Sequence, residues 1–279
     1  MEQTVSAHTA ASQRPVMEAR IGAHSDPGKV RSNNEDSLVI FDLRGGKPVA
    51  PSATIVAPLQ APGLLLIVAD GMGGMKSGEL ASKMAVTDFP NAFVKRMGKV
   101  KEENSAALGE ALKEVHKKIF TTAQSSSEMK GMGTTMTALL LREDHVLVAQ
   151  VGDSRAYLGR RNKVTQITRD QTVWESMKKG AAEDAEQEFS NAPWKNMLSQ
   201  ALGAQEDLNV VVTEHAVEFD DWLLLCSDGL YRVVKPDDMA AAFWSSGAPQ
   251  EKAKRLVDLA NERGGPDNCS VILCHLGVR

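Results

Sequence analysis

The chain of 279 residues has only three cysteines, no excess of positive charge and no long hydrophobic run. Cys226, Cys269 and Cys274 lie in apolar stretches, show no CxxC spacing and are odd in number, which argues against a zinc site or a disulfide framework. Free cysteine is among the residues most often buried. We therefore expect three reduced core thiols in a cytoplasmic protein.

The composition does not favour a membrane or a nucleic acid as the partner of this protein. The longest aliphatic run, residues 64–69, is far shorter than the roughly 20 residues that a membrane-spanning helix needs. The first residues contain no apolar stretch typical of a signal peptide. Lys and Arg number 32 against 36 Asp and Glu, a net charge of −4, so no overall basic character indicates nucleic-acid binding, although a local basic patch is not excluded. We expect a monomer.

The order of apolar patterns predicts an α+β protein with helices over antiparallel sheets. We expect strands at residues 37–41, 64–69, 135–141, 145–152, 154–159, 163–168, 208–217, 221–227 and 269–276, and helices at 77–97, 103–123, 236–246 and 249–262. The Pro- and Gly-rich residues 42–63 are typical of a long hairpin connection with some strand of its own. The four strands from 135 to 168 are joined by short turns, which favours an antiparallel meander. We predict one domain, residues 18–279, after a flexible tail, residues 1–17.

Five aspartates lie where expected strands begin or end: Asp36, Asp70, Asp153, Asp228 and Asp267. A carboxylate at the end of a buried strand costs free energy unless it is paired or binds a cation, and gathered carboxylates repel one another unless a cation lies among them. Oxygen ligands without His or Cys select Mg²⁺ or Mn²⁺ over Zn²⁺. Taken singly, an Asp-Gly pair is more simply a turn signal. The prediction therefore depends on the whole set.

Six segments of the sequence, in this order, carry a resemblance: VRSNNEDS, VADGMGG, GMGTTMTALLL, VGDSRAY, LCSDGL and PDNCSVIL. Over residues 18–277 the chain resembles the metal-dependent protein serine/threonine phosphatases of the protein phosphatase 2C type, and most of all the bacterial branch. The resemblance implies an α-β-β-α sandwich, in which two antiparallel β-sheets are flanked by helices. It also implies hydrolysis of phosphoserine and phosphothreonine in proteins, opposing a Ser/Thr kinase.

The resemblance also implies a set of metal ligands for two Mn²⁺ or Mg²⁺ ions, with a third, weaker ion site. Asp70 would bridge the two ions, and the Gly71 carbonyl would bind one of them, because glycine lets the backbone approach closely. Asp228 and Asp267 would complete the protein ligands of one ion. Asp153, together with Asp228, would support the third. Water bridging two of the ions would attack phosphorus directly.

Further residues receive roles from the same motifs. Asp36, or its neighbour Glu35, would face the other ion directly or through water. Arg31 would hold the substrate phosphate, for which its planar fork suits two oxygens at once. Asn268 would orient the Asp267 turn or a bound water, and Thr134 with the threonine after it would support the site.

Two positions depart from the family pattern. Met72 stands where animal members place a histidine that protonates the leaving group, so the general acid is open. Gln171 stands where many bacterial members carry histidine. Residues 171–202 match a flap next to the active site, which is either a solvated helical face or a substrate-selecting lid. Trp174 and Trp194 are its candidate anchors.

Three other functions compete with a general protein phosphatase. The chain could serve a single phosphorylated regulator, or it could be a catalytically weak regulator that binds phosphoproteins without hydrolysing them. The intact acid set argues against the latter, because a binding module has no need of every ligand. A metal-dependent nuclease also needs clustered acids, but the net charge and the absence of a basic stripe argue against it.

Overall fold

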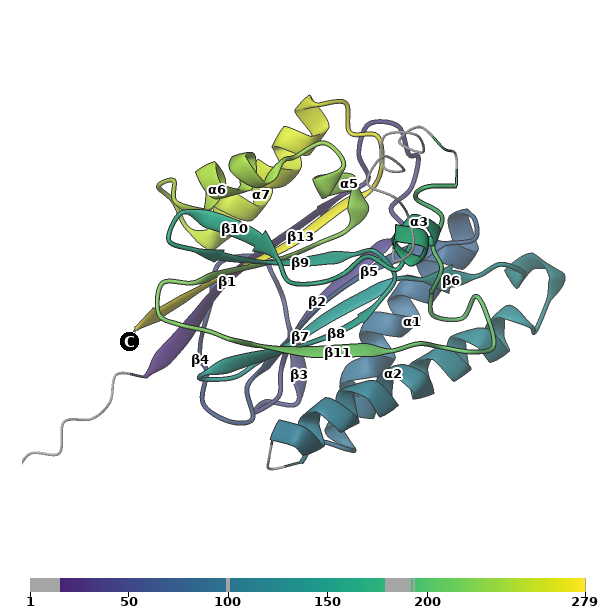
Figure 1. The fold of residues 1–279 in the computed structure, drawn as a ribbon, viewed down its shortest axis with the longest axis horizontal. Coiled ribbons are helices and arrows are strands. Elements are labelled where there is room, and N and C mark those ends of the chain that lie inside the picture. Colours follow the sequence, from purple (N-terminus) through teal and green to yellow (C-terminus); the bar gives the residue numbers. More distant parts are fainter. Residues whose placement is uncertain (1–15, 99–100, 179–191, 193, 279) are drawn as a thin grey trace, which may run out of the picture.

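The computed structural model describes residues 16–98, 101–178, 192 and 194–278, and shows four layers (Figure 1). One sheet has six strands in the order β10-β9-β12-β13-β1-β4, and the other has seven, in the order β11-β8-β7-β5-β2-β3 with β6 paired to β5. Every strand pair in the described ranges is antiparallel. Helices α1 and α2 cover the seven-stranded sheet, and α6 and α7 cover the other. The expected α-β-β-α sandwich is confirmed.

The bounds of the elements are as follows. The strands are β1 (Met17–Asp26), β2 (Asp36–Asp42), β3 (Lys47–Val49), β4 (Ile55–Pro58), β5 (Leu64–Met72), β6 (Gly133–Thr134), β7 (Met136–Leu141), β8 (His145–Val151), β9 (Arg155–Arg160), β10 (Lys163–Gln166), β11 (Val211–Ala216), β12 (Trp222–Cys226) and β13 (Cys269–Val278). The helices are α1 (Met75–Val94), α2 (Lys101–Ala123), the short 3₁₀ helix η1 (Ser127–Met129), α3 (Val173–Met177), α5 (Asp228–Tyr231), α6 (Pro236–Phe243) and α7 (Pro249–Glu262).

Strand β5 shows why the sequence has an unbroken aliphatic run there. Leu64, Leu66 and Val68 pack into the core between the two sheets. Leu65 and Ile67 point the other way, into the core beneath α1 and α2. Because successive side chains of a strand face opposite sides, a strand covered on both faces needs apolar residues throughout. This run fixes β5 in the middle of the sandwich.

The two predicted apolar helices are confirmed as the cover of the seven-stranded sheet. Phe89 and Phe93 of α1 and Leu108 and Leu112 of α2 are fully buried. Each helix therefore buries the stripe that its three- and four-residue spacing predicts. In the described part of the chain no helix is both long and apolar enough to cross a membrane.

The predicted meander from 135 to 168 is wrong at its centre. β7 pairs with β8 and β9 pairs with β10, but β8 lies in one sheet and β9 in the other. The turn between them contains Gly152, whose φ of 96° lies in the left-handed region that favours glycine. A short turn between strands therefore carries the chain across the sandwich here, and Asp153 lies at the crossing.

The amino-terminal part also differs from expectation. The apolar patterns of the sequence do not predict β1, which lies in the six-stranded sheet between β13 and the edge strand β4. It begins at Met17, the last residue assigned to the tail; residues 1–15 of that tail lie outside the described residues. β2 and β5 pair as the expected hairpin. The connection between them, however, sends β4 into the opposite sheet.

Candidate active site

The predicted acids gather at one end of the sandwich, around a pocket of about 460 Å³. Residues that line it include Arg31, Glu35, Asp70, Gly71, Met72, Thr135, Asp153, Asp228, Arg232, Asp267 and Asn268. Asp36 is buried beside them. These residues come from both sheets and from segments more than 200 positions apart in the sequence. All five aspartates singled out in the sequence therefore belong to one place.

Asp36 and Asp70 are direct cross-strand partners between β2 and β5. They continue the face that Ile40, Leu66 and Val68 turn toward the core between the sheets. β5 extends through Met72, so Asp70 lies inside the strand and not at its end as expected. Like charges directly opposite each other destabilise a strand pair. Something other than sheet stability must account for this arrangement.

Burial and mutual repulsion disfavour the charged forms of these acids. Burial raises the pKa of Asp36 to about 7, against the hydrogen bond from the Ser227 hydroxyl to Oδ2 (2.6 Å). Burial raises the pKa of Asp153 to about 6, with the charge of Asp228 adding to it. The pKa of Asp70 is raised well above its usual range by burial and then by the charge of Asp36. A cation among them would reverse these shifts.

The donor set fits a hard divalent cation. Asp36 Oδ1 and Asp228 Oδ1 are buried and have no hydrogen-bond partner within the described part of the chain. Two carboxylates are paired with arginines: Asp228 with Arg232, and Asp267 Oδ2 with Arg31 Nη2 at 2.8 Å. Within the described ranges, no group of three or more Asp, Glu, His or Cys side chains is arranged closely enough to hold a metal ion. Carboxylate oxygens are the ligands that such a cation prefers, but Asp228 and Asp267 would have to leave their arginine partners to bind it.

The backbone around Asp70 is held from both sides. Thr135 Oγ1 accepts from the Asp70 amide (3.0 Å), while the Thr134 hydroxyl and the Thr135 amide each donate to the Asp70 carbonyl at 2.8 Å. A Cβ on Gly71 would lie 2.2 Å from the Gly78 carbonyl oxygen and 2.7 Å from that of Glu35. Only glycine fits between these carbonyls, so the turn after Asp70 is fixed in place.

Asn268 fixes the loop that carries Arg31. Its Oδ1 accepts from the Glu35 amide (2.8 Å), and its Nδ2 donates to the carbonyls of Pro27 (2.9 Å) and Asn33 (2.8 Å). Arg31 is exposed and its Nη2 reaches Asp267. The structure thus brings an accessible guanidinium to the rim of the acid cluster, as a phosphate-binding arginine requires.

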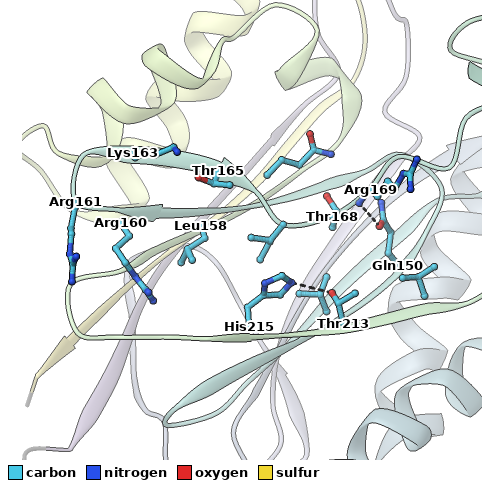
Figure 2. A pocket seen from close by; sticks show the side chains of 14 residues that line it. Gln150, Leu158, Arg160, Arg161, Lys163, Thr165, Thr168, Arg169, Thr213 and His215 are labelled. Carbon is cyan, nitrogen blue, oxygen red and sulfur yellow. Dashed lines mark hydrogen bonds between the residues drawn. The ribbon is translucent and has the colours of Figure 1, made fainter. Parts of the chain in front are cut away.

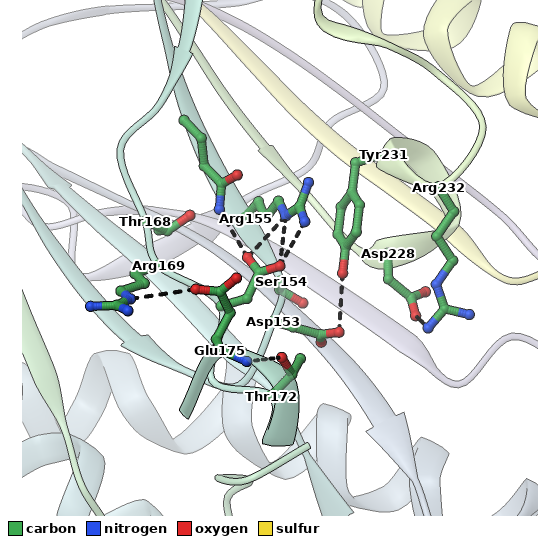
Figure 3. Close-up of polar contacts among 12 residues, drawn as sticks. Asp153, Ser154, Arg155, Thr168, Arg169, Thr172, Glu175, Asp228, Tyr231 and Arg232 are labelled. Carbon is green, nitrogen blue, oxygen red and sulfur yellow. Dashed lines mark hydrogen bonds and ion pairs between the residues drawn. The ribbon is translucent and has the colours of Figure 1, made fainter. Parts of the chain in front are cut away.

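A cluster that the sequence analysis does not predict holds Asp153 (Figure 3). The Tyr231 hydroxyl donates to Asp153 Oδ2 at 3.0 Å, and the Arg155 guanidinium lies 3.5 Å above the Tyr231 ring. Arg155 is itself held by Asp170 through Nε–Oδ1 (2.9 Å) and Nη2–Oδ2 (2.6 Å). The only hint in the sequence is the position of Tyr231 directly after the Asp-Gly-Leu motif, and that position does not reveal its contact with Asp153.

The structure shows where the two residues that depart from the family pattern, Gln171 and Met72, lie. The side-chain Oε1 of Gln171 accepts from the backbone N–H of Gly152 (2.7 Å), and the backbone N–H of Gln171 donates to the Gly152 carbonyl (3.0 Å). This glutamine therefore holds the turn before Asp153. Met72 lines the pocket, and no histidine is among the described lining residues.

The described residues include only part of the predicted flap, residues 171–202. Trp174, on α3, is buried and lies 6.4 Å from Trp194, centroid to centroid. Residues 179–191 and 193, the middle of the predicted flap, lie outside the described residues. The two tryptophans therefore pack together where the flap begins and ends. Their predicted role toward a substrate remains a prediction.

The chain is similar to known bacterial phosphatases over most of its length. A sequence profile described as protein phosphatase 2C matches residues 56–260. The serine/threonine phosphatase stp of Listeria welshimeri is 35% identical over 251 residues, which cover 89% of this chain and 92% of that protein. A serine/threonine phosphatase structure from S. agalactiae superposes with a TM-score of 0.80 at 30% identity, covering 92% of this chain and 99% of that one. The catalytic domain of the phosphatase PstP, solved in complex with two manganese ions, gives a TM-score of 0.71 at 30% identity, covering 94% and 99%.

Proposed function

The chain belongs to the protein phosphatase 2C family, and from that membership we propose that it hydrolyses phosphoserine and phosphothreonine esters in proteins with two bound divalent cations. The observation that carries this proposal is the position of Asp36 and Asp70 directly opposite each other, with an unpartnered buried oxygen on Asp36 and Arg31 at the rim. Such a set has little reason to exist without cations and an anionic substrate.

We propose that Asp70 would serve both ions and that Asp228, Asp267 and the Gly71 carbonyl would complete the ligands of one. Asp36 would serve the other directly or through water. Once bound, such ions lower the pKa of water and neutralise charge on a phosphoryl group. The solved PstP domain with two manganese ions supports a centre of two ions. Asp153 would support a third ion, and oxygen ligands of this kind suit Mn²⁺ or Mg²⁺.

The residues of the chain then have distinct tasks toward the substrate. Arg31, which pairs with Asp267 in this structure, would place its planar fork on two phosphate oxygens. Asn268 keeps the Arg31 loop in position through its three hydrogen bonds. Thr134 and Thr135 keep the Asp70 carbonyl in place. Orientation of this kind contributes to catalysis by avoiding reorganisation during the reaction.

We infer that the partners are phosphoproteins of a cytoplasmic Ser/Thr kinase pathway. The relatives named serine/threonine phosphatase support this class of substrate. A non-hydrolysing phosphoprotein binder is the second candidate. The complete acid set speaks against it, since binding a phosphate would need Arg31 but not five aspartates gathered around it.

Hydrolysis of p-nitrophenyl phosphate tests the proposal. We expect turnover with Mn²⁺, none with EDTA, and a loss of at least about 100-fold in Asp228→Asn, because a cation would lose a charged ligand. Asp258→Asn, an exposed carboxylate on α7, is the matched control and should retain full activity. An inert wild type with Mn²⁺ on this ester and on phosphopeptides would favour the binding module; activity that survives EDTA would refute the metal mechanism.

A further inference from the structure

A second cavity, of about 730 Å³, lies between the two sheets at the edge formed by β9, β10, β8 and β11 (Figure 2). The residues that line it are Val148, Gln150, Leu158, Arg160, Arg161, Lys163, Thr165, Gln166, Ile167, Thr168, Arg169, Val211, Thr213 and His215. It shares no residue with the pocket of the aspartates. Its volume is within the range of small-molecule sites.

The cavity exists because the inward-facing positions change character at this edge. Toward the middle of the sandwich those positions hold aliphatic residues such as Val148 and Leu158. Their cross-strand partners on the two edge strands are Thr213 and Thr165, and both threonines are exposed. Short polar side chains there do not fill the space between the sheets. The result is an apolar floor beneath a polar opening.

The charges at the opening are all of one sign. Of the described residues that line the cavity, four are Arg or Lys and none is acidic, in a chain of net charge −4. Three of the four, Arg160, Arg161 and Lys163, gather at the β9–β10 hairpin, at one end of the cavity (Figure 2). Such a cluster attracts anions to that end.

Acids on neighbouring elements neutralise only part of this charge. Arg160 is bound by the buried Asp221 (Nη2–Oδ2, 2.6 Å) and reaches Glu218 at 3.1 Å. Arg161 comes no closer than 3.8 Å to Glu218, and its side chain is 86% exposed. Lys163 is exposed as well. Three cations therefore face two acids at this end, which leaves one positive charge in excess.

We propose that this cavity binds a small amphiphilic anion, with its apolar body on Val148, Leu158 and Ile167 and its charged head at the hairpin beside Lys163. An uncharged apolar molecule would leave the surplus charge unused, and a small hydrophilic anion would leave the apolar floor exposed. Both features are met only by a molecule that has an apolar part and an anionic end.

An occupant would also touch a residue connected to the active site. Gln150 lines the cavity and is buried. Its Nε2 donates to the carbonyls of Gly152 (3.2 Å) and Ser154 (3.4 Å), on either side of Asp153. Its Oε1 accepts from the Arg169 amide (3.2 Å). The cavity therefore adjoins the turn that presents one of the five aspartates, without containing any proposed metal ligand.

Titration of the full chain with decanoate, below the concentration at which it forms micelles, tests the proposal by calorimetry. We expect saturable binding of one decanoate, with the uncharged methyl ester and the cationic decyltrimethylammonium binding at least about fivefold more weakly. Thr213→Trp would place an indole in the space beside Val148 and should weaken binding at least about tenfold. Lys163→Glu should weaken it about fivefold, because an attraction becomes a repulsion.

Two controls make the result decisive. Lys117→Glu, on the exposed face of α2, changes the net charge by the same amount far from the cavity and should bind decanoate as the wild type does. Thermal unfolding of each variant shows that it is folded. Absence of saturable binding, equal binding of the methyl ester, or binding unchanged in both Thr213→Trp and Lys163→Glu would overturn the proposal.

Discussion

Single carboxyl groups in the site make the ion-free protein sensitive to pH. The raised pKa values of Asp36 (about 7) and Asp153 (about 6) mean that the folded state holds these protons more tightly than the unfolded chain, where the pKa of Asp is about 4. For an acid of raised pKa the cost of ionisation is absent below the unfolded value and complete above the folded one. Stability should therefore rise as the pH falls from about 8 to about 5.

Thermal unfolding in EDTA measures this effect. We expect the wild type to unfold roughly 5 °C or more higher at about pH 5 than at about pH 8, since each pKa unit corresponds to about 1.4 kcal/mol. In Asp36→Asn the difference should shrink, because one titrating group is gone. Asp238, whose pKa the Arg263 guanidinium lowers to about 2, does not titrate in this window. An equal difference in wild type and variant would contradict this account.

At the residue scale, the types of the site residues were more predictable than their supports. Each aspartate stands beside a recognisable turn or strand, so chemistry alone could select it. Tyr231 and Arg155 are ordinary residues in the sequence and acquire their role only through the hydrogen bond and stacking that the fold creates. Contacts between distant segments have no local signature, which is why this support was missed.

At the scale of elements, Gly71 decides whether β5 can pass between its neighbours. A Cβ there would meet backbone oxygens of Gly78 and Glu35, which cannot move aside as a flexible side chain could. We expect Gly71→Ala to lower the free energy of unfolding by about 2 kcal/mol or more and to reduce phosphatase activity, because the strand must shift at Asp70.

A second glycine supplies the matched control in denaturant unfolding. Gly109, inside α2, has nothing within 4 Å of a built Cβ. Gly109→Ala should leave activity unchanged and stabilise the protein by about 0.5–1 kcal/mol, because alanine favours the helix. Equal stability losses in the two variants would show that close approach at Gly71 is not the cause.

Strands and helices with strong apolar periodicity were predictable, and crossings between sheets were not. β5, α1 and α2 follow directly from their apolar patterns. The short turn at Gly152 is indistinguishable in sequence from a hairpin turn, yet it joins two sheets. Local propensity describes the turn but not the partner of the strand that follows, and that partner decides where Asp153 is placed.

At the scale of the whole molecule, the proposed ions would join the two sheets. Asp36 and Asp70 belong to the seven-stranded sheet, whereas Asp228 and Asp267 lie next to β12 and β13 of the other. The core between the sheets is apolar along most of its length and ends in these acids. Without cations, repulsion between the carboxylates would weaken the contact between the two sheets at this end of the sandwich. Binding should be coupled to global stability.

Thermal unfolding with increasing MnCl₂ tests this coupling without reference to catalysis. A ligand that binds only the folded state stabilises it by about 2.7 kcal/mol at a hundredfold excess over its dissociation constant. We expect the wild type to show such a rise, Asp258→Asn to match it and Asp70→Asn to lose most of it, since Asp70 would contact both ions. NaCl at equal ionic strength should give a smaller rise, because it only screens the repulsion. A wild type indifferent to Mn²⁺, or a full rise in Asp70→Asn, would mean that the acids do not join the sheets through ions.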